Sequence, residues 1–303
     1  MIPAKISERL NMNKTAPSRN SLQAFKPWEG ECKTKPWHRK VTVVIPVMDT
    51  FEQLSICIEL LRCQSVKPYI VVIDTGSDEE NLERICGLRD EDIEVHSLRL
   101  NAVKHPSDFP AIAMDLGFSL CRTEYLFATH TDVFAKRIDL LEHFLGLCET
   151  ESPVVGYQIS PRAHDDWVGM VSHTATMYHM PTMDKVGFGW SLRRLCNTFG
   201  IADHRPNPMR PCWRDTELLG NYILRQNDIK PHLIGKEENF KMTRDDNIDH
   251  FRSFTSGKLY SHSYFSVANE WYEQARKEAL DRIEEWKAVG DQYTTVKTKE
   301  LNG

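Results

Sequence analysis

Short hydrophobic runs and helically spaced hydrophobic residues take turns along residues 41 to 150. The run VTVVIPV at 41–47 is apolar, rich in β-branched residues and uninterrupted, which is typical of a strand buried on both faces. In the next segment, the apolar residues from Leu54 to Leu61 have the spacing of an amphipathic helix. The pattern therefore predicts a buried strand followed by a helix.

The same succession repeats further along the chain. Additional strands are predicted from YIVVID, IEVHSLRL and TEYLFATHTD, at 69–74, 93–100 and 123–132. Helices are predicted from a start near Ser77, over 111–121 and over 138–148. Strands and helices in this rhythm predict an α/β fold with a mostly parallel central sheet, right-handed crossovers and flanking helices.

From residue 151 onward the pattern is mixed. VVGYQIS is strand-like, and a loop-rich region rich in Pro, Arg and aromatic residues follows it. A helix is predicted from DTELLGNYILRQN and a short strand from KPHLIG. The segment ANEWYEQARKEALDRIEEWKAVG predicts a long amphipathic helix near the C-terminus that stops at Gly290.

Composition places the chain among ordinary soluble globular proteins. It has 303 residues, of which 41% are hydrophobic and 27% charged, and a formal net charge of -5, which argues against a broad nucleic-acid-binding surface. The 8 cysteines form no C-x-x-C pair, so we expect reduced thiols and a cytoplasmic location. No apolar stretch has the length of a membrane span, and no integral membrane segment is expected.

Two acidic residues follow predicted strands, and each allows two interpretations. Asp74 precedes Gly76 and Ser77, and this turn either contacts a nucleobase or ribose or only caps the next helix. Asp132 follows His130 in THTD, and the pair either binds a divalent cation or forms a strand-end turn in which Asp132 caps the next helix. Imidazole with carboxylate suits Mn²⁺ better than Ca²⁺. Both acids are expected on the sheet edge where parallel strands end, which is where ligands bind.

Two further groups carry weaker signals. Asp215 and Glu217 begin a predicted helix, where a carboxylate acts either as a general base or as a capping group stabilised by the helix dipole. His250 either supplies a late metal ligand or is a surface histidine, and His262 competes for that role. The chain has no P-loop, G-x-G-x-x-G, H-E-x-x-H or G-x-S-x-G motif, so several common enzyme classes are unsupported.

Taken in order, four segments resemble a family 2 glycosyltransferase with the GT-A fold. VTVVIPVMDTFEQLSICIELLRCQ resembles the opening strand and helix, and YIVVIDTGSDEEN resembles the Asp-x-x-Ser turn that holds the nucleotide. AIAMDLGFSLCRTEYLFATHTD resembles the approach to the metal-binding D-x-D motif. RDTELLGNYILRQN resembles the helix whose Glu-Asp motif supplies the base. The resemblance covers residues 41 to 260 of the chain.

The resemblance implies a role for each matching residue on the donor side. Asp74 would contact the base of the sugar nucleotide, in a pocket lined by Val47 and Asp49. Asp132 matches the last acid of D-x-D, which binds the metal, and His130 stands at the first acid's position, a ribose or metal contact.

Other matches are carried over with departures from the family pattern. Asp215 matches the catalytic base and Glu217 the following acid, while Arg214 replaces the Glu of Glu-Asp. His250 matches a late histidine that binds metal or diphosphate in many members. Gly76 and Asp115 complete the expected nucleotide contacts. Met114 and Asp115 stand where many members have Arg-Asn.

The activity implied by this resemblance is an inverting transfer of sugar from a nucleoside-diphosphate sugar, most readily a UDP-sugar, to an acceptor hydroxyl. The implied cofactor is a divalent metal, Mn²⁺ or Mg²⁺. The expected acceptor is a glycan, while protein, small-molecule and modified-DNA acceptors remain open. Trp190 and Trp213 are candidates for stacking on it.

Two alternatives stay open beside this hypothesis. One is a pseudo-glycosyltransferase that binds a nucleotide sugar or a glycan without transfer, which the departures at His130 and Arg214 favour. The other is a sugar nucleotidyltransferase, which usually needs a Gly-rich basic loop after the first strand. PVMDTFEQL has no Gly, Lys or Arg.

The implied organisation has four parts. They are a polar arm at 1–39, a nucleotide-sugar-binding half at 40–150, an acceptor-binding half at 151–262, and a C-terminal helix and tail at 263–303. Peripheral association with a membrane through the C-terminal helix remains open, although the acidic residues on this helix disfavour binding to anionic lipid.

Overall fold

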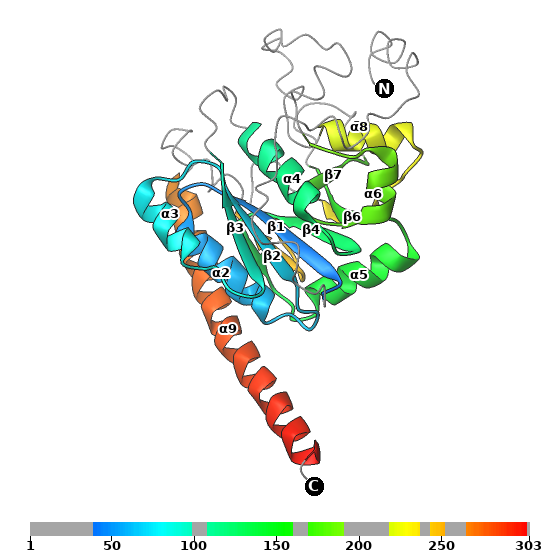
Figure 1. Cartoon of the computed structure of the whole chain (residues 1–303). Helices are drawn as coiled ribbons and strands as arrows, with labels where there is room; N and C mark the ends of the chain where they lie inside the picture. Colours follow the sequence, from blue (N-terminus) through cyan, green and yellow to red (C-terminus); the bar gives the residue numbers. More distant parts are fainter. Residues whose placement is uncertain are drawn as a thin grey trace.

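A computed structural model describes residues 39–98, 108–159, 169–190, 218–236, 243–251 and 265–301 of the chain. Its main element is a seven-stranded sheet with the strand order β3-β2-β1-β4-β7-β6-β8 (Figure 1). Its strands are β1 (Val41–Val47), β2 (Tyr69–Asp74), β3 (Ile93–Ser97), β4 (Tyr125–Thr129), β6 (Val154–Gln158), β7 (Val171–His179) and β8 (His232–Lys236). Only β7 runs antiparallel to its neighbours, β4 and β6, so the sheet is mostly parallel.

Helices cover both faces of this sheet. One face carries α2 (Phe51–Arg62), α3 (Glu79–Cys86), α5 (Leu140–Thr150) and α9 (Phe265–Leu301). The other carries α4 (Asp108–Leu120), α6 (Met180–Val186) and α8 (Leu218–Gln226). Strand β1 serves both layers, because alternate side chains of a strand point to opposite faces. Val43 and Ile45 join the first core, and Val44 joins the second.

A second, smaller sheet lies on the face that carries α2 and α9. It is antiparallel, with the order β5-β10-β9, and consists of β5 (Val133–Ala135), β10 (Ile248–His250) and β9 (Thr243–Arg244). The side chains of β5 belong to the same core as α2, α5 and α9. This small sheet joins a segment near the middle of the chain to one close to its C-terminal helix.

The predicted fold class is confirmed, since the structure is a mixed α/β arrangement with a mostly parallel central sheet, flanking helices and a C-terminal helix. One prediction was wrong: the region after β6 was expected to be loop-rich, yet β7 occupies the middle of the sheet. Strand β7 was missed because it contains polar residues such as Ser172, Thr174 and Thr176, which are unusual in a buried strand. They are buried because β7 is covered on both faces.

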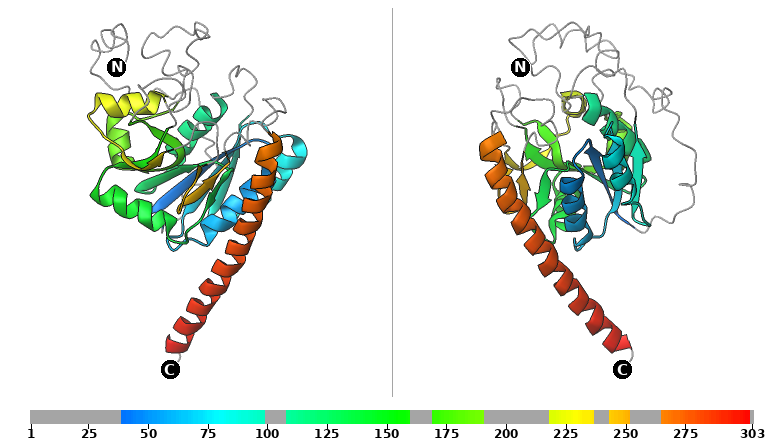
Figure 2. Two further views of the ribbon diagram at one scale, coloured as in Figure 1. Left: turned by 180° about the vertical axis from the view of Figure 1, so that it is seen from behind. Right: turned by 90° about the vertical axis from the view of Figure 1, so that its left-hand side faces the viewer.

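The C-terminal helix also differs from its prediction. Helix α9 does not end at Gly290 but continues to Leu301, and its C-terminal part extends beyond the other described elements (Figures 1 and 2). A single glycine inside a helix costs about 0.5–1 kcal/mol, which the helix-forming residues around it offset. The polar arm predicted at 1–39 lies outside the described residues except for Arg39.

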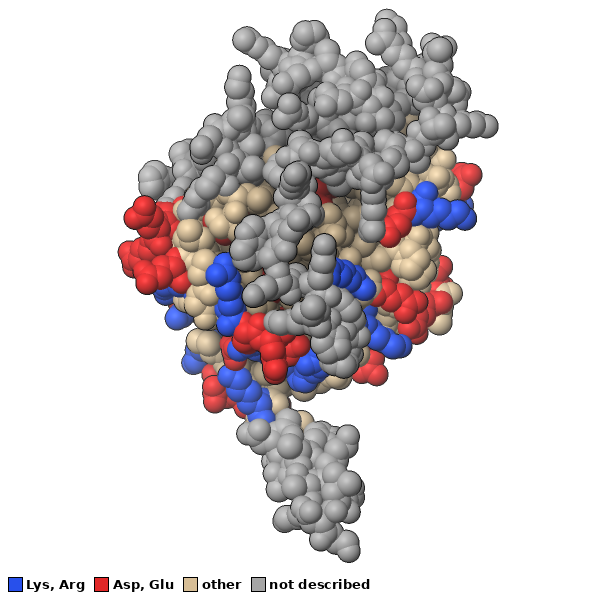
Figure 3. Space-filling model, in the orientation of Figure 1, with Lys and Arg blue, Asp and Glu red and all other residues tan. Residues whose placement is uncertain are grey.

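The described surface carries mixed charge. On the face in Figure 3, acidic and basic side chains of the described residues are interspersed, with an acidic group over α3. Among the described helices, none combines the length and apolar character needed to cross a bilayer.

Candidate metal and nucleotide site

The site lies where β1, β2 and β4 end. β2 and β3 extend the sheet to one side of β1, whereas β4 pairs with its other side. The strand order therefore reverses between β1 and β4, and ligands of open α/β sheets bind in the crevice outside the carboxyl ends at such a point. The side-chain hydroxyls of Thr50, after β1, and Thr131, after β4, lie 3.1 Å apart and link the two loops at this point.

Asp74 organises the turn after β2. Its side chain is buried, and its Oδ1 accepts a hydrogen bond from the backbone N–H of Ser77 at 2.9 Å. Its Oδ2 accepts one from the hydroxyl of Ser97 at 2.8 Å. These bonds fix the turn that the sequence assigned to nucleotide binding, and a contact between Asp74 and a nucleobase stays a prediction.

Asp49 and Ser77 join the loops after β1 and β2. The backbone N–H of Asp49 donates to Ser77 Oγ, and Asp49 Oδ1 accepts from the backbone N–H of Asp78, both at 2.8 Å. Asp49 has a φ of 53°, a left-handed conformation that non-glycine residues adopt uncommonly and that is enriched at functional sites. Val47, at the end of β1, is buried, and its carbonyl accepts from the Thr75 N–H at 2.9 Å.

The helix after this turn is capped by Asp78, whose side chain accepts from the backbone N–H of Asn81. Gly76 has a φ of 130°, a backbone conformation that residues with a Cβ rarely adopt. No atom lies within 4 Å of the position that a Cβ on Gly76 would take. The exposed backbone at Gly76 is therefore accessible to a ligand.

Asp115 lies on α4 rather than at the strand ends. It is buried, and its Oδ1 accepts a hydrogen bond from the backbone N–H of Trp190 at 2.8 Å. Trp190 itself is 1% exposed and packs edge-on against Phe188, with ring centroids 4.8 Å apart. Stacking of Trp190 on an acceptor is therefore a wrong prediction, because its ring belongs to the core.

The segment THTD forms the tight connection between β4 and β5. The backbone N–H of Val133 donates to the carbonyl of His130 at 3.3 Å, which closes the turn. Thr131 and Asp132 are fully buried, whereas the side chain of His130 is 19% exposed. Because a strand follows, Asp132 does not cap a helix, and the strand-end interpretation in that form is wrong.

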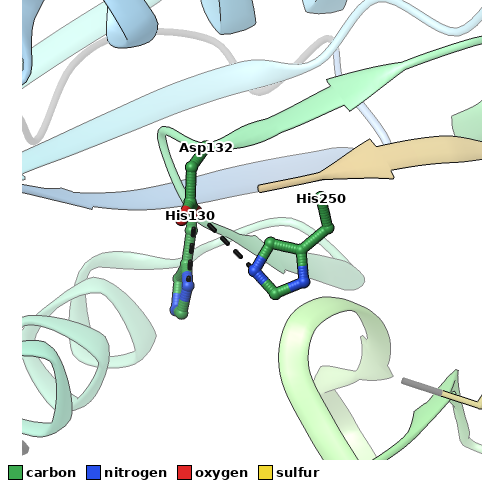
Figure 4. A group of neighbouring side chains, drawn as sticks. All are labelled: His130, Asp132 and His250. Atoms are coloured by element: carbon green, nitrogen blue, oxygen red, sulfur yellow. Dashed lines mark ion pairs between the residues drawn. The ribbon is translucent and has the colours of Figure 1, made fainter. Parts of the chain in front are cut away.

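His250 reaches Asp132 through strand pairing. β10 pairs antiparallel with β5, so that His250 is opposite Val133, and the N–H of Phe251 donates to the Asp132 carbonyl at 3.0 Å. His250 Nε2 then lies 3.8 Å from Asp132 Oδ1, and His130 Nδ1 lies 3.9 Å from the same atom (Figure 4). One ligand atom of each residue lies within 4.8 Å of the other two.

This cluster fits a divalent metal ion. Neither carboxylate oxygen of Asp132 accepts a hydrogen bond from the described residues, although both are buried. A buried carboxylate in that state is unfavourable unless a cation compensates its charge. One carboxylate and two imidazoles form a donor set that suits Mn²⁺ and related transition metals better than Ca²⁺. The sequence had placed His130, Asp132 and His250 as metal ligands, and the structure brings these three together.

His173 is a third imidazole ring at this cluster, and the sequence analysis missed it. It lies on β7, is buried, and its ring centroid is 4.4 Å from that of His130 at an interplanar angle of 66°. The pairing of Thr129 with Ala175 across β4 and β7 brings it there. The only sequence signal was a histidine in VSHTATMYH, and it carried no weight without the strand.

Cys57 of α2 lies beneath the THTD turn. Its thiol is directed at the His130 carbonyl, with Sγ 3.7 Å from the oxygen. Burial raises the pKa of Cys57 to about 12, and the Asp132 carboxylate acts in the same direction. The thiol is therefore neutral at ordinary pH and adds no second negative charge beside Asp132.

Several predicted site residues lie outside the described residues. They are the expected base Asp215, the following acid Glu217, the competing histidine His262, and Trp213.

Comparison with the sequences of known proteins gives a match over part of the chain. No family model matches the chain. Pre-mycofactocin glycosyltransferases of two Mycobacterium tuberculosis strains, CDC 1551 / Oshkosh and ATCC 25618 / H37Rv, are each 30% identical to it over 197 residues. The match covers 59% of this chain and 39% of the relative, so the chain spans about two fifths of the length of these relatives.

Solved structures of glycosyltransferases show a distant likeness. The mannosyltransferase PcManGT from Pyrobaculum calidifontis, in complex with GDP-Man and Mn²⁺, has a TM-score of 0.45 at 13% identity, covering 93% of this chain and 85% of that one. TarS 1-349 of S. aureus with UDP-GlcNAc has a TM-score of 0.40 at 14% identity, covering 50% and 48%. Because both TM-scores are low, what identifies the chain as similar to glycosyltransferases is the sequence match over 197 residues.

Proposed function

We propose that the chain is a metal-dependent glycosyltransferase of the GT-A type, related to family 2, that uses a nucleoside-diphosphate sugar. The observation that carries the proposal is the cluster of His130, Asp132 and His250 at the point where the strand order reverses. The sequence similarity to glycosyltransferases over 197 residues supports the same reaction class.

The nucleotide would bind beside β1 and β2. The exposed Gly76 follows β2 and Asp49 follows β1, whereas His130 and Asp132 follow β4 on the other side of β1. A nucleoside beside Asp49 and Gly76 would direct its diphosphate toward His130 and Asp132. From the resemblance to family 2 glycosyltransferases we propose a UDP-sugar as the donor for this chain.

Asp132, His250 and His130 would hold the metal ion. When bound, the ion offsets the negative charge that develops on the departing nucleoside diphosphate. Mn²⁺ is the proposed ion, because two imidazoles accompany one carboxylate. In this arrangement Asp132 contributes the charge, and His250 is fixed by its strand while His130 faces the more open side.

Asp215 is the proposed general base, from the sequence alone. It would take the proton from the acceptor hydroxyl while that oxygen attacks the anomeric carbon. The bond from the anomeric carbon to the diphosphate breaks in the same step, which inverts the configuration and releases the nucleoside diphosphate. Glu217, two residues later in the sequence, is the acid that follows the base in the matched motif, and a glycan is the proposed class of acceptor.

A thermal-shift panel tests the donor and the metal together. Nucleoside diphosphates and their sugars are added to the whole chain with Mn²⁺ or with EDTA, using wild type, Asp132→Ala and Asp132→Asn. A ligand that binds only the native state raises the free energy of unfolding by mass action, by about 2.7 kcal/mol when its concentration is a hundred times Kd. The melting temperature rises as a result. We expect one nucleotide to give a Mn²⁺-dependent shift in wild type that both variants lose.

Release of nucleoside diphosphate with a glycan acceptor then tests transfer, and Asp215→Asn should abolish it while the thermal shift persists. Binding without any turnover would favour the non-catalytic pseudo-glycosyltransferase. No shift with any nucleotide in the presence of Mn²⁺ would contradict the proposed function.

A further inference from the structure

Helix α9 packs directly behind the strands that carry the metal ligands. Figures 1 and 2 show it running along the face that also holds α2, and both helices belong to one core. Its buried residues over this length include Tyr272, Ala275, Ala279 and Ile283. The helix therefore contacts the protein through a continuous apolar stripe near the small sheet.

An aromatic triad links α9 to both ligand-bearing strands. The ring of Tyr272 is centred 5.6 Å from that of Phe251 and 6.4 Å from that of Phe134. Phe134 and Phe251 are themselves 5.1 Å apart. Phe134 lies on β5 two residues after Asp132, and Phe251 directly follows His250. All three rings are buried, so a shift of Tyr272 would be transmitted to both strands because packed cores do not deform continuously.

A buried ion cluster makes a second connection between α9 and β10. Asp249 is 0% exposed, and its Oδ1 accepts a hydrogen bond from Arg244 Nε at 2.9 Å, with Lys136 Nζ at 3.9 Å. Arg282 of α9 places Nη2 3.6 Å from Asp249 Oδ2. Glu278 of α9 accepts from Arg244 Nη2 at 2.6 Å. The carboxylate thus receives cations from the end of β5, from β9 and from α9.

Asp249 and His250 are consecutive residues of β10. Side chains of consecutive strand residues point to opposite faces, so the face that holds Asp249 against α9 is the reverse of the face that holds His250 against Asp132. Any displacement of β10 at Asp249 therefore moves His250 as well. Burial lowers the pKa of Arg282, against the effect of the Asp249 and Glu278 carboxylates, so this position is costly to keep for stability alone.

We infer that α9 is a positioning element of the metal site, with Arg282, Asp249 and Tyr272 as the positioning residues that hold His250 beside Asp132. This inference rests on the proposed function, because it requires the cluster to bind a metal. None of the three residues is among the proposed metal ligands. By linkage, a helix that favours the metal-binding arrangement is in turn stabilised when the metal binds.

The test measures Mn²⁺ binding to the whole chain without any donor, by titration followed by electron paramagnetic resonance. Arg282→Met removes the cation but keeps most of the side-chain volume, and Arg282→Lys keeps the cation. Arg276→Met is the matched control, since Arg276 lies on the same helix in an exposed pair with Glu273. Loss of a supporting partner typically weakens metal binding about 10–100-fold, and we expect a Kd increase in this range for Arg282→Met alone.

Two further measurements separate positioning from general stability. Tyr272→Leu disturbs the aromatic triad without changing charge, and the Kd of this variant for Mn²⁺ should also rise. If Arg282→Met does not fold, Tyr272→Leu tests whether α9 positions the metal ligands. In wild type, Mn²⁺ should slow amide hydrogen exchange in α9 from 272 to 283 as well as in β10, and this slowing should disappear in Asp132→Asn.

The outcomes distinguish this inference from the proposed function. If wild type binds Mn²⁺ and loses it in Asp132→Asn, but Arg282→Met and Tyr272→Leu bind it as tightly as Arg276→Met, the helix is only structural and the inference is overturned. If wild type itself binds no Mn²⁺, the metal site of the proposed function fails, and the inference fails with it. A selective loss in Arg282→Met that Arg282→Lys restores supports it.

Discussion

His250 Nε2 lies 3.8 Å from Asp132 Oδ1 because β10 pairs with β5 directly after the THTD turn. The two residues are far apart in the sequence, and the hydrogen bond from the Phe251 N–H to the Asp132 carbonyl fixes their alignment. The cluster of His130, Asp132 and His250 therefore forms where the end of β4 in the main sheet leads into the small sheet. The position of His250 therefore depends on how β10 packs against α9 as well as on its pairing with β5.

Two fully buried aspartates, Asp132 in the turn before β5 and Asp249 on β10, should differ in how their neutralisation changes the free energy of unfolding. Asp132 accepts no hydrogen bond from the described residues, whereas Asp249 receives three cations. In metal-free protein we expect Asp132→Asn to leave the free energy of unfolding unchanged or raise it by about 1–2 kcal/mol, since a buried charge is removed. Asp249→Asn should lower it by about 3–5 kcal/mol, since three partly buried cations lose their buried carboxylate partner.

Urea unfolding in EDTA measures both changes on the same scale. An equal loss for the two variants would mean that Asp132 stabilises the fold, which would argue against a site shaped for a cation. Addition of Mn²⁺ should then stabilise wild type but not Asp132→Asn.

Replacing the glycines inside α4 and α5 by alanine should change the free energy of unfolding in opposite directions. A Cβ on Gly117 would lie 2.3 Å from Cγ1 of Val44 on β1, whereas nothing lies within 4 Å of a Cβ on Gly146. Gly117→Ala should therefore lower the free energy of unfolding by about 1–3 kcal/mol through overpacking. Gly146→Ala should raise it by about 0.5–1 kcal/mol, because alanine has the better helix propensity.

Thermal and urea unfolding of the two variants provides the measurement, with each glycine serving as the control for the other. If Gly117→Ala were as stable as wild type, this result would contradict the tight packing of α4 against Val44 of β1.

Stability at alkaline pH should depend on Cys148. Burial raises its pKa to about 12, with the Glu149 carboxylate acting in the same direction, while its ordinary value is 9.0. Below pH 9 both states hold the proton. Above pH 9 the unfolded chain releases it and the folded protein does not, so the free energy of unfolding falls by about 1.4 kcal/mol per pH unit until the folded thiol also titrates.

Cys148→Ala should remove this dependence, so the difference in stability between wild type and variant should shrink or reverse from pH 9 to pH 11. Urea unfolding at several pH values measures it. Cys63→Ala is the comparison, because Cys63 is only partly buried and should show a smaller effect. A difference that stays constant over this range would contradict the raised pKa.

His173 should matter to the metal site through its ring. The T-shaped contact with His130, at 4.4 Å between centroids, restricts the orientation of a proposed ligand. His173→Phe keeps an aromatic ring, so we expect a Kd for Mn²⁺ close to that of wild type. His173→Ala should raise the Kd about tenfold or more, as loss of support for a ligand usually does.

Titration with Mn²⁺ distinguishes this role from direct ligation. Equal weakening in the phenylalanine and alanine variants would show that the imidazole nitrogens are needed, and His173 would then be a ligand rather than a support.

Much of the first half of the chain could be read from local pattern. β1 and β2 are continuous apolar, β-branched runs, and the ends of the strands now labelled β2 and β4 predicted Asp74 and Asp132 on one edge of the sheet. Strand β7 could not be read this way. Its serine, threonine and histidine side chains look like loop, yet they are accommodated by local bonds such as that from the Ser172 hydroxyl to Thr174 Oγ1, at 2.8 Å.

The sequence by itself determined the α/β fold class, the edge on which the site lies, and the carboxylate at its centre. These follow from hydrophobic period and strand polarity, which are properties of short segments. The tertiary structure placed His250, which the sequence had left in competition with His262, beside Asp132. It alone showed that the ring of His173 contacts His130 and that α9 packs against Phe134 and Phe251. Each of these depends on pairing or packing between segments distant in the chain, and such contacts are selected by the whole core rather than by any local pattern.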